Sequence, residues 1–281
     1  RSRNEKVRLI SSFISSLHRQ EIPIAVRFLT GRTLGEQEMK RVGVGGATLW
    51  KLSKAESLQA PLLPSDTGTS LLDVGRTFDS LASLSGKDRQ QRAENLLHGL
   101  FSRFNELERK YAFRLLSGEM ELGAVDGVLL AAIAASSKVS LDKVRRAYML
   151  IGDIGSVAEQ ALTDSNTLLS VRIVLFKPVR PMLAEMANNI QEILRAHRRG
   201  TAFEYKYDGA RIQIHKRGDN VRIFSRRLTD VTSSVPEIVT LAAAHVRSEN
   251  ALVEGEVIAV DGHGRPLPFQ DLMRRFTRVH D

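Results

Sequence analysis

The sequence of 281 residues contains no cysteine, and this absence excludes disulfide bonds, thiolate metal sites and cysteine nucleophiles. It is compatible with an intracellular protein. No uninterrupted apolar run reaches membrane-spanning length, so we expect no membrane partner. The seven histidines are scattered without a pair three or four residues apart, which argues against a histidine-based metal site. Neither a G-x-x-x-x-G-K-[ST] phosphate loop nor a G-x-S-x-G nucleophile elbow occurs.

The sequence has fewer acidic than basic residues. Lysine and arginine number 41 against 32 acidic residues, which gives a formal net charge of +9 and a pI near 10.0. Such a balance favours a polyanionic partner, with nucleic acid as the first candidate. A ribosomal surface or an anionic membrane surface would fit the charge equally well. At this length, we expect two domains rather than one core.

The first 172 residues are predicted to form an all-helical domain with a basic surface. Apolar residues recur at helical spacing throughout, and no convincing strand occurs before about residue 169. The longest periodic stretch predicts a helix over residues 89–116. Glycines cluster at Gly43, Gly45 and Gly46, where we expect a tight turn between helices; backbone contact with a phosphate is the compatible alternative.

Residues 173–281 are predicted to form an α+β domain with an antiparallel sheet. Pro178 and Pro181 mark a crossing between the domains. Residues 217–220 have the composition of a turn between two alternating runs, which predicts a hairpin. A further strand over residues 252–260 places Glu254 and Glu256 on one side, where we expect them to face solvent, a cation or hydroxyl groups.

One short segment has residue types that suit chemistry better than packing. Residues 201–207 alternate as a half-buried strand does, with Glu204 and Lys206 on one face. Asp208 continues that face, and Gly209 permits a turn or a close approach of backbones. A K-x-D-G match arises by chance in about one chain in twenty of this length, so the motif alone decides nothing.

Lys206 can act as a nucleophile if its amine is kept neutral, which burial or nearby positive charge favours. The flanking acids oppose this, so a cationic partner is needed, such as Arg211, Arg226 or a bound metal ion. The alternative is an edge strand whose lysine and glutamate simply pair on a solvated face.

Four segments in order resemble the ATP-dependent DNA ligases, in particular the bacterial and archaeal members. They are residues 177–184 (KPVRPMLA), 204–211 (EYKYDGAR), 224–227 (FSRR) and 252–261 (LVEGEVIAVD). The helical part is similar to that family's DNA-binding domain at residues 114–118, at Leu122 and Gly123, and at the glycine-rich turn. Glu119 and Glu121 stand where many relatives place basic residues, which weakens a phosphate grip at that loop.

The resemblance implies a fold, a reaction and the roles of five residues. The second domain would be the N-terminal part of a nucleotidyltransferase (ATP-grasp-like adenylation) domain. Lys206 would attack the α-phosphate of ATP and carry AMP, which then passes to the 5′-phosphate of a nick before the 3′-hydroxyl seals the strand. Glu204 would recognise the adenine amino group, Arg211 and Arg226 the ribose or phosphates, and Glu256 a ribose hydroxyl.

The resemblance also implies ATP with Mg²⁺ or another divalent cation as cofactors, and nicked duplex DNA as partner. We expect a cytoplasmic, nucleoid-associated monomer that serves DNA repair, replication or recombination. The family's adenine-stacking aromatic, metal-binding glutamate, phosphate-binding lysines and OB-fold domain have no counterpart up to Asp281. The sequence is therefore expected to be a fragment or a truncated product, with weak or absent self-adenylation, and no metal ligand is assigned within it.

Two other functions remain open from the sequence. The first is a non-catalytic DNA-binding protein in which the lysine segment is a vestige. The second is an RNA ligase or capping-type nucleotidyltransferase, which shares the lysine motif but not the helical N-terminal domain.

Overall fold

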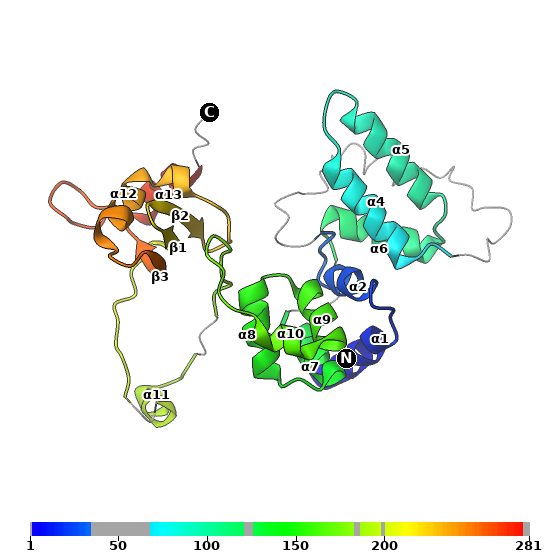
Figure 1. Cartoon of the computed structure of the whole chain (residues 1–281), viewed down its shortest axis with the longest axis horizontal. Helices are drawn as coiled ribbons and strands as arrows, with labels where there is room; N and C mark the ends of the chain where they lie inside the picture. Colours follow the sequence, from blue (N-terminus) through cyan, green and yellow to red (C-terminus); the bar gives the residue numbers. More distant parts are fainter. Residues whose placement is uncertain (1, 35–67, 121–125, 183–185, 198–199, 278–281) are drawn as a thin grey trace. The chain divides into compact units, whose positions relative to one another are not determined.

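The computed structural model describes residues 2–34, 68–120, 126–182, 186–197 and 200–277. The chain divides into two compact units, Arg1–Val171 and Arg172–Asp281 (Figure 1). The predicted glycine turn at Gly43 to Gly46 and the predicted loop positions Glu121 to Gly123 lie outside the described residues. No helix in the described ranges is both long enough and apolar enough to cross a membrane.

The first unit is helical wherever it is described. Its helices are α1 (Arg3–Ser15), α2 (Ile22–Leu29), α4 (Leu71–Ser83), α5 (Arg89–Phe101), α6 (Glu106–Ser117), α7 (Asp126–Ser137), α8 (Leu141–Ile151), α9 (Ile154–Thr163) and α10 (Ser165–Ser170). One apolar core joins α1 and α2 with α7 to α10, and a second joins α4 to α6. Phe28 on α2 reaches the second core, where its ring lies 5.6 Å from that of Phe78.

The long helix predicted over residues 89–116 is wrong, because the chain ends α5 at Phe101 and starts α6 at Glu106. Asn105 begins the new helix. Its side chain accepts from the Glu108 amide, and the Glu108 carboxylate accepts from the Asn105 amide. This reciprocal capping satisfies two otherwise unpaired amides. The apolar spacing continues through the break because Phe104 stays buried within the turn.

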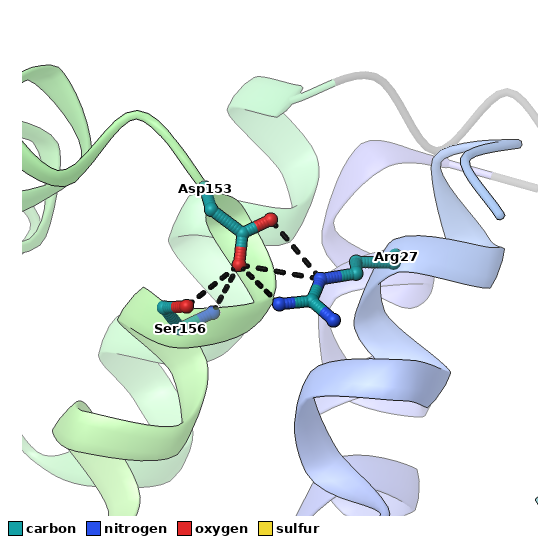
Figure 2. Close-up of polar contacts among 3 residues, drawn as sticks. All are labelled: Arg27, Asp153 and Ser156. Atoms are coloured by element: carbon teal, nitrogen blue, oxygen red, sulfur yellow. Dashed lines mark hydrogen bonds and ion pairs between the residues drawn. The ribbon is translucent and has the colours of Figure 1, made fainter. Parts of the chain in front are cut away.

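A buried ion pair joins α2 to the start of α9 (Figure 2). The Asp153 side chain is 4 % exposed and lies 2.7 Å from Arg27 Nη2. Its carboxylate also accepts from the amide and hydroxyl of Ser156, at 2.8 and 2.7 Å. Burial raises the pKa of Asp153, but the Arg27 and Ser156 contacts outweigh it and hold the pKa below its ordinary value. Gly155 permits this approach, since a Cβ there would lie 2.5 Å from the Pro23 carbonyl oxygen.

The second unit is built on a three-stranded antiparallel sheet in the order β2-β1-β3. Its elements are α11 (Ile190–Ala196), β1 (Ala210–Arg217), β2 (Asn220–Ser225), the 3₁₀ turn Thr232–Ser234, α12 (Pro236–His245), β3 (Asn250–Val257) and α13 (Phe269–Thr277). The predicted hairpin is confirmed, with Arg217 opposite Asn220 and Gly218 at φ +56° between them. One sheet face, including Ile212 and Ile223, packs against α12.

The strand predicted over residues 201–207 is wrong. These residues carry no regular secondary structure, and the sheet begins only at Ala210. Both edges of β1 are already occupied, by β2 and by β3, so the segment does not pair there. Its alternating aromatic side chains are exposed, with Tyr205 at 87 % and Phe203 at 73 %. Alternation alone therefore did not produce a strand here, because the segment pairs with none of the described strands.

Candidate active site

The segment that carries Lys206 enters the sheet through Gly209. A Cβ at this position would lie 2.3 Å from the Val257 carbonyl oxygen and 2.9 Å from Glu256 Cγ. Any larger residue would therefore push β1 and β3 apart at their ends. The close backbone approach predicted for this glycine is confirmed, and it fixes where the lysine segment meets the sheet.

Arg211 lies directly opposite Glu256 in the register of β1 and β3. Its guanidinium Nη2 donates to Glu254 Oε2 at 2.5 Å, and both side chains are a little over one third exposed. The predicted placement of Glu254 and Glu256 on one side of their strand is confirmed, because alternate β3 residues oppose Arg211 and Gln213 on the same face of β1. Arg211 therefore lies on the same face of the sheet as two carboxylates and is hydrogen-bonded to one of them.

Gln213 lies two positions after Arg211 in β1 and hydrogen-bonds to Glu254 of this pair. Its side-chain nitrogen donates to Glu254 Oε1 at 2.7 Å and also to the Val179 carbonyl oxygen, while its oxygen accepts from the Val179 amide at 2.9 Å. The residue is 3 % exposed, so its amide would be costly to bury without these partners. Gln213 therefore clamps the proline-flanked segment around Val179 onto the sheet.

His215 extends the same network along β1. The ring is fully buried, and Nδ1 accepts from the Phe176 amide at 3.0 Å. Nδ1 must then be unprotonated, which leaves Nε2 as the donor to Gln213 Oε1 at 3.3 Å. Burial lowers the pKa of His215, in agreement with a neutral ring. The ring also meets Phe224 edge-on at 4.9 Å.

The sequence did not single out Gln213 or His215 as parts of this arrangement. Glu254 was placed on the correct face and was expected to meet solvent, a cation or hydroxyl groups; its partner is the Arg211 guanidinium. No sequence signal marked the burial of Gln213 and His215, because they alternate with Ile212 and Ile214 as the solvent-facing residues of a strand do.

Three predicted site residues, Arg226, Glu204 and Lys206, are not part of the hydrogen-bond network around Gln213. Arg226 is exposed and directly follows β2, whose last residue Ser225 pairs with Ile212, so it sits at the same end of the sheet as Arg211. Glu204 and Lys206 are exposed in the segment before Gly209. Across the described residues, no hydrogen bond or ion pair joins Glu204, Lys206 or Arg226 to the Arg211 pair.

The described ranges hold no group of three or more His, Cys, Asp or Glu side chains able to bind an ion.

Two protein-family descriptions match the sequence. "ATP dependent DNA ligase domain" matches residues 181–281, and "DNA ligase N terminus" matches residues 53–134. Residues 181–281 therefore belong to the family described as ATP dependent DNA ligase domain. The first match contains all five predicted site residues, Glu204, Lys206, Arg211, Arg226 and Glu256.

Relatives that align with nearly all of this chain are named DNA ligases or probable DNA ligases. The DNA ligase of Thermococcus onnurineus is 36% identical over 98% of this chain, and that of Methanothrix thermoacetophila is 37% identical over 98%. A protein named "Probable DNA ligase" from Saccharopolyspora erythraea is 38% identical, again over 98% of this chain. The aligned region makes up 54%, 54% and 52% of these three proteins, so this chain spans about half the length of the curated relatives it matches.

Proposed function

We propose that the protein seals nicks in duplex DNA with ATP, through a covalent AMP intermediate on Lys206. The names of the relatives and the match of residues 181–281 to an ATP-dependent ligase domain support this reaction. In this proposal, residues 172–281 belong to an adenylation domain of the nucleotidyltransferase type, and the helical unit belongs to a DNA-binding domain.

The first chemical step forms a phosphorus–nitrogen bond. The neutral Lys206 amine attacks the α-phosphorus of ATP, the bond from that phosphorus to the β-phosphate bridging oxygen breaks, and pyrophosphate leaves. The amine loses a proton as the phosphoramidate forms. AMP then passes to the 5′-phosphate of the nick, and the 3′-hydroxyl displaces AMP to close the strand.

The proposed ligand roles are those implied by the resemblance to DNA ligases, and the geometry of the sheet supports the role of Arg211. Arg211 is held by Glu254 at the sheet end beside Gly209, so its guanidinium is oriented before a nucleotide arrives. A planar guanidinium binds phosphate oxygens in pairs, and the exposed Arg226 can add a second one. Glu256 offers a carboxylate to ribose hydroxyls, and Glu204 an acceptor for the adenine amino group. ATP brings its own divalent cation, which neutralises charge on the phosphates.

DNA binding is assigned to the helical unit on the basis of its exposed cations. Exposed basic side chains occur on α6 and α8, at Lys110, Arg114, Lys143 and Arg145. Such residues bind phosphates without reading sequence, as a nick-sealing enzyme requires.

The observation that supports the proposal is the close approach of Gly209 to β3, because Lys206 precedes Gly209 by three residues and Arg211 of the Arg211–Glu254 pair by five. The test is an intact-mass measurement after incubation with ATP and magnesium. We expect one AMP adduct that is lost in Lys206→Ala and kept in Lys143→Ala, which removes an exposed lysine of the helical unit. An adduct that persists in Lys206→Ala would contradict the assignment.

Because the chain spans about half the length of its relatives, the same measurement is also made on the protein expressed from its gene. If that protein forms no adduct but binds nicked duplex in a salt-sensitive manner, a non-catalytic DNA-binding role replaces the proposed one.

A further inference from the structure

Two arginines share one phenylalanine ring on the polar face of the sheet. The guanidinium carbons of Arg217 and Arg222 lie 5.4 and 5.7 Å from the ring centroid of Phe176. Arg222 opposes His215, and Arg217 lies two positions further along β1 on the same face. The two residues are therefore diagonal neighbours across β1 and β2, with about 7–8 Å between their Cα atoms.

Phe176 is fixed in this position against its own backbone preference. It has φ +68°, in the left-handed region that non-glycine residues rarely adopt. The hydrogen bond from its amide to His215 Nδ1 and the clamp of Val179 by Gln213 hold the chain there. The aromatic platform is thus set by the fold and does not depend on the arginines.

Among the described residues, the two charges at this platform share a single ion pair with a carboxylate. Arg222 has one acidic neighbour, Asp230, at the long distance of 4.0 Å, and more than half of its side chain is exposed. Arg217 is exposed and has no ion pair within the described ranges. Two like charges held near one ring repel each other, and an anion between them removes that cost. A guanidinium stacked on a ring still presents its N–H edges to a ligand.

We propose that Phe176, Arg217 and Arg222 form a binding site for a backbone phosphate of the duplex, separate from the nucleotide site. This inference rests on the proposed function and extends it to the DNA footprint of the second unit. Arg211 and Arg217 are six positions apart in β1, which corresponds to about 20 Å. With about 3.4 Å of duplex axis per nucleotide of one strand, the bound phosphate lies no more than about six nucleotides from the nick.

The first experiment measures affinity for a nicked, 5′-phosphorylated duplex over a range of salt concentrations. For the double variant Arg217→Gln, Arg222→Gln we expect about a tenfold loss of affinity and a salt slope smaller by about 0.9, which is the contribution of the one phosphate contact that is removed. The lysine variants Arg217→Lys and Arg222→Lys should keep most of the slope. Arg247→Gln, which removes an exposed arginine just after α12, is the matched control.

The second experiment replaces single phosphates on either side of the nick by uncharged methylphosphonates. One position within about six nucleotides should weaken binding to the unaltered protein and have no further effect on the double variant, because the two changes remove the same contact. Phosphate of ATP is the other source of this chemistry, and an unchanged KM for ATP in adduct formation assigns the site to DNA.

The proposal is overturned if the double variant matches Arg247→Gln in affinity and salt slope, if no methylphosphonate position is sensitive to the variant, or if the KM for ATP rises instead. DNA affinity is measured by binding alone and does not require the protein to ligate the nick. A protein that forms no AMP adduct would refute the proposed function, while these binding measurements would still decide the phosphate site.

Discussion

Removal of the negative charge of Asp153 should destabilise the helical unit strongly. The perturbation is Asp153→Asn, which keeps the size of the side chain and one oxygen. Oδ2 accepts from Arg27 Nη2, the Ser156 amide and the Ser156 hydroxyl, while Oδ1 accepts from Arg27 Nε. An amide can keep its oxygen toward Ser156, but its nitrogen then faces the Nε donor of Arg27.

The magnitude follows from the burial of the two partners. Removing one member of a buried ion pair costs about 3–5 kcal/mol, because the other charge stays behind without its partner. Arg27 is 23 % exposed and gains some hydration, so we expect a loss near the lower limit, about 3 kcal/mol. For a unit of this size, such a loss lowers the melting temperature by about 6–12 °C.

The assay is urea unfolding followed by far-ultraviolet circular dichroism. The described residues of the first unit are mostly helical, so this signal reports mainly on that unit. Asp142→Asn is the matched control, because Asp142 is 92 % exposed and lies 3.5 Å from Arg145; it should cost less than about 0.5 kcal/mol. Equal costs for the two variants would refute the argument from burial.

Three further outcomes are expected. Because the folded pKa of Asp153 lies below its ordinary value of 3.8, its stabilisation is present above that pH and is lost as the pH falls through the folded pKa; the stability gap to Asp153→Asn, measured by urea unfolding, should shrink below pH 3.8 and would be constant if the aspartate were not held ionised. Gly209→Ala should cost about 1–3 kcal/mol by forcing the added Cβ against the Val257 carbonyl, and should reduce AMP adduct formation; wild-type values in both assays would show that the backbones do not meet. Gln213→Leu should leave both polar groups of Val179 unpaired and cost about 1–3 kcal/mol, with faster proteolysis near residue 179, whereas an unchanged cleavage rate would contradict the clamp.

The sequence predicted the features that depend on short-range chemistry. The hairpin at Gly218 follows from turn residues between alternating runs, and Gly209 was identified as a point of close approach. The helix over residues 89–116 failed because apolar spacing carries through Phe104, while the capping pair Asn105 and Glu108 ends one helix and starts the next. Capping chemistry was present in the sequence and outweighed periodicity.

Tertiary contacts decided which of these residues meet. Local alternation placed Glu254 and Glu256 on one face, but only the pairing of β1 with β3 brought that face to Arg211, and only the buried Gln213 joined it to Val179. Those partners are separated by more than thirty residues of chain, and local patterns do not encode pairing at that range. Residues 201–207 pair with none of the described strands, and their local alternation did not reveal this.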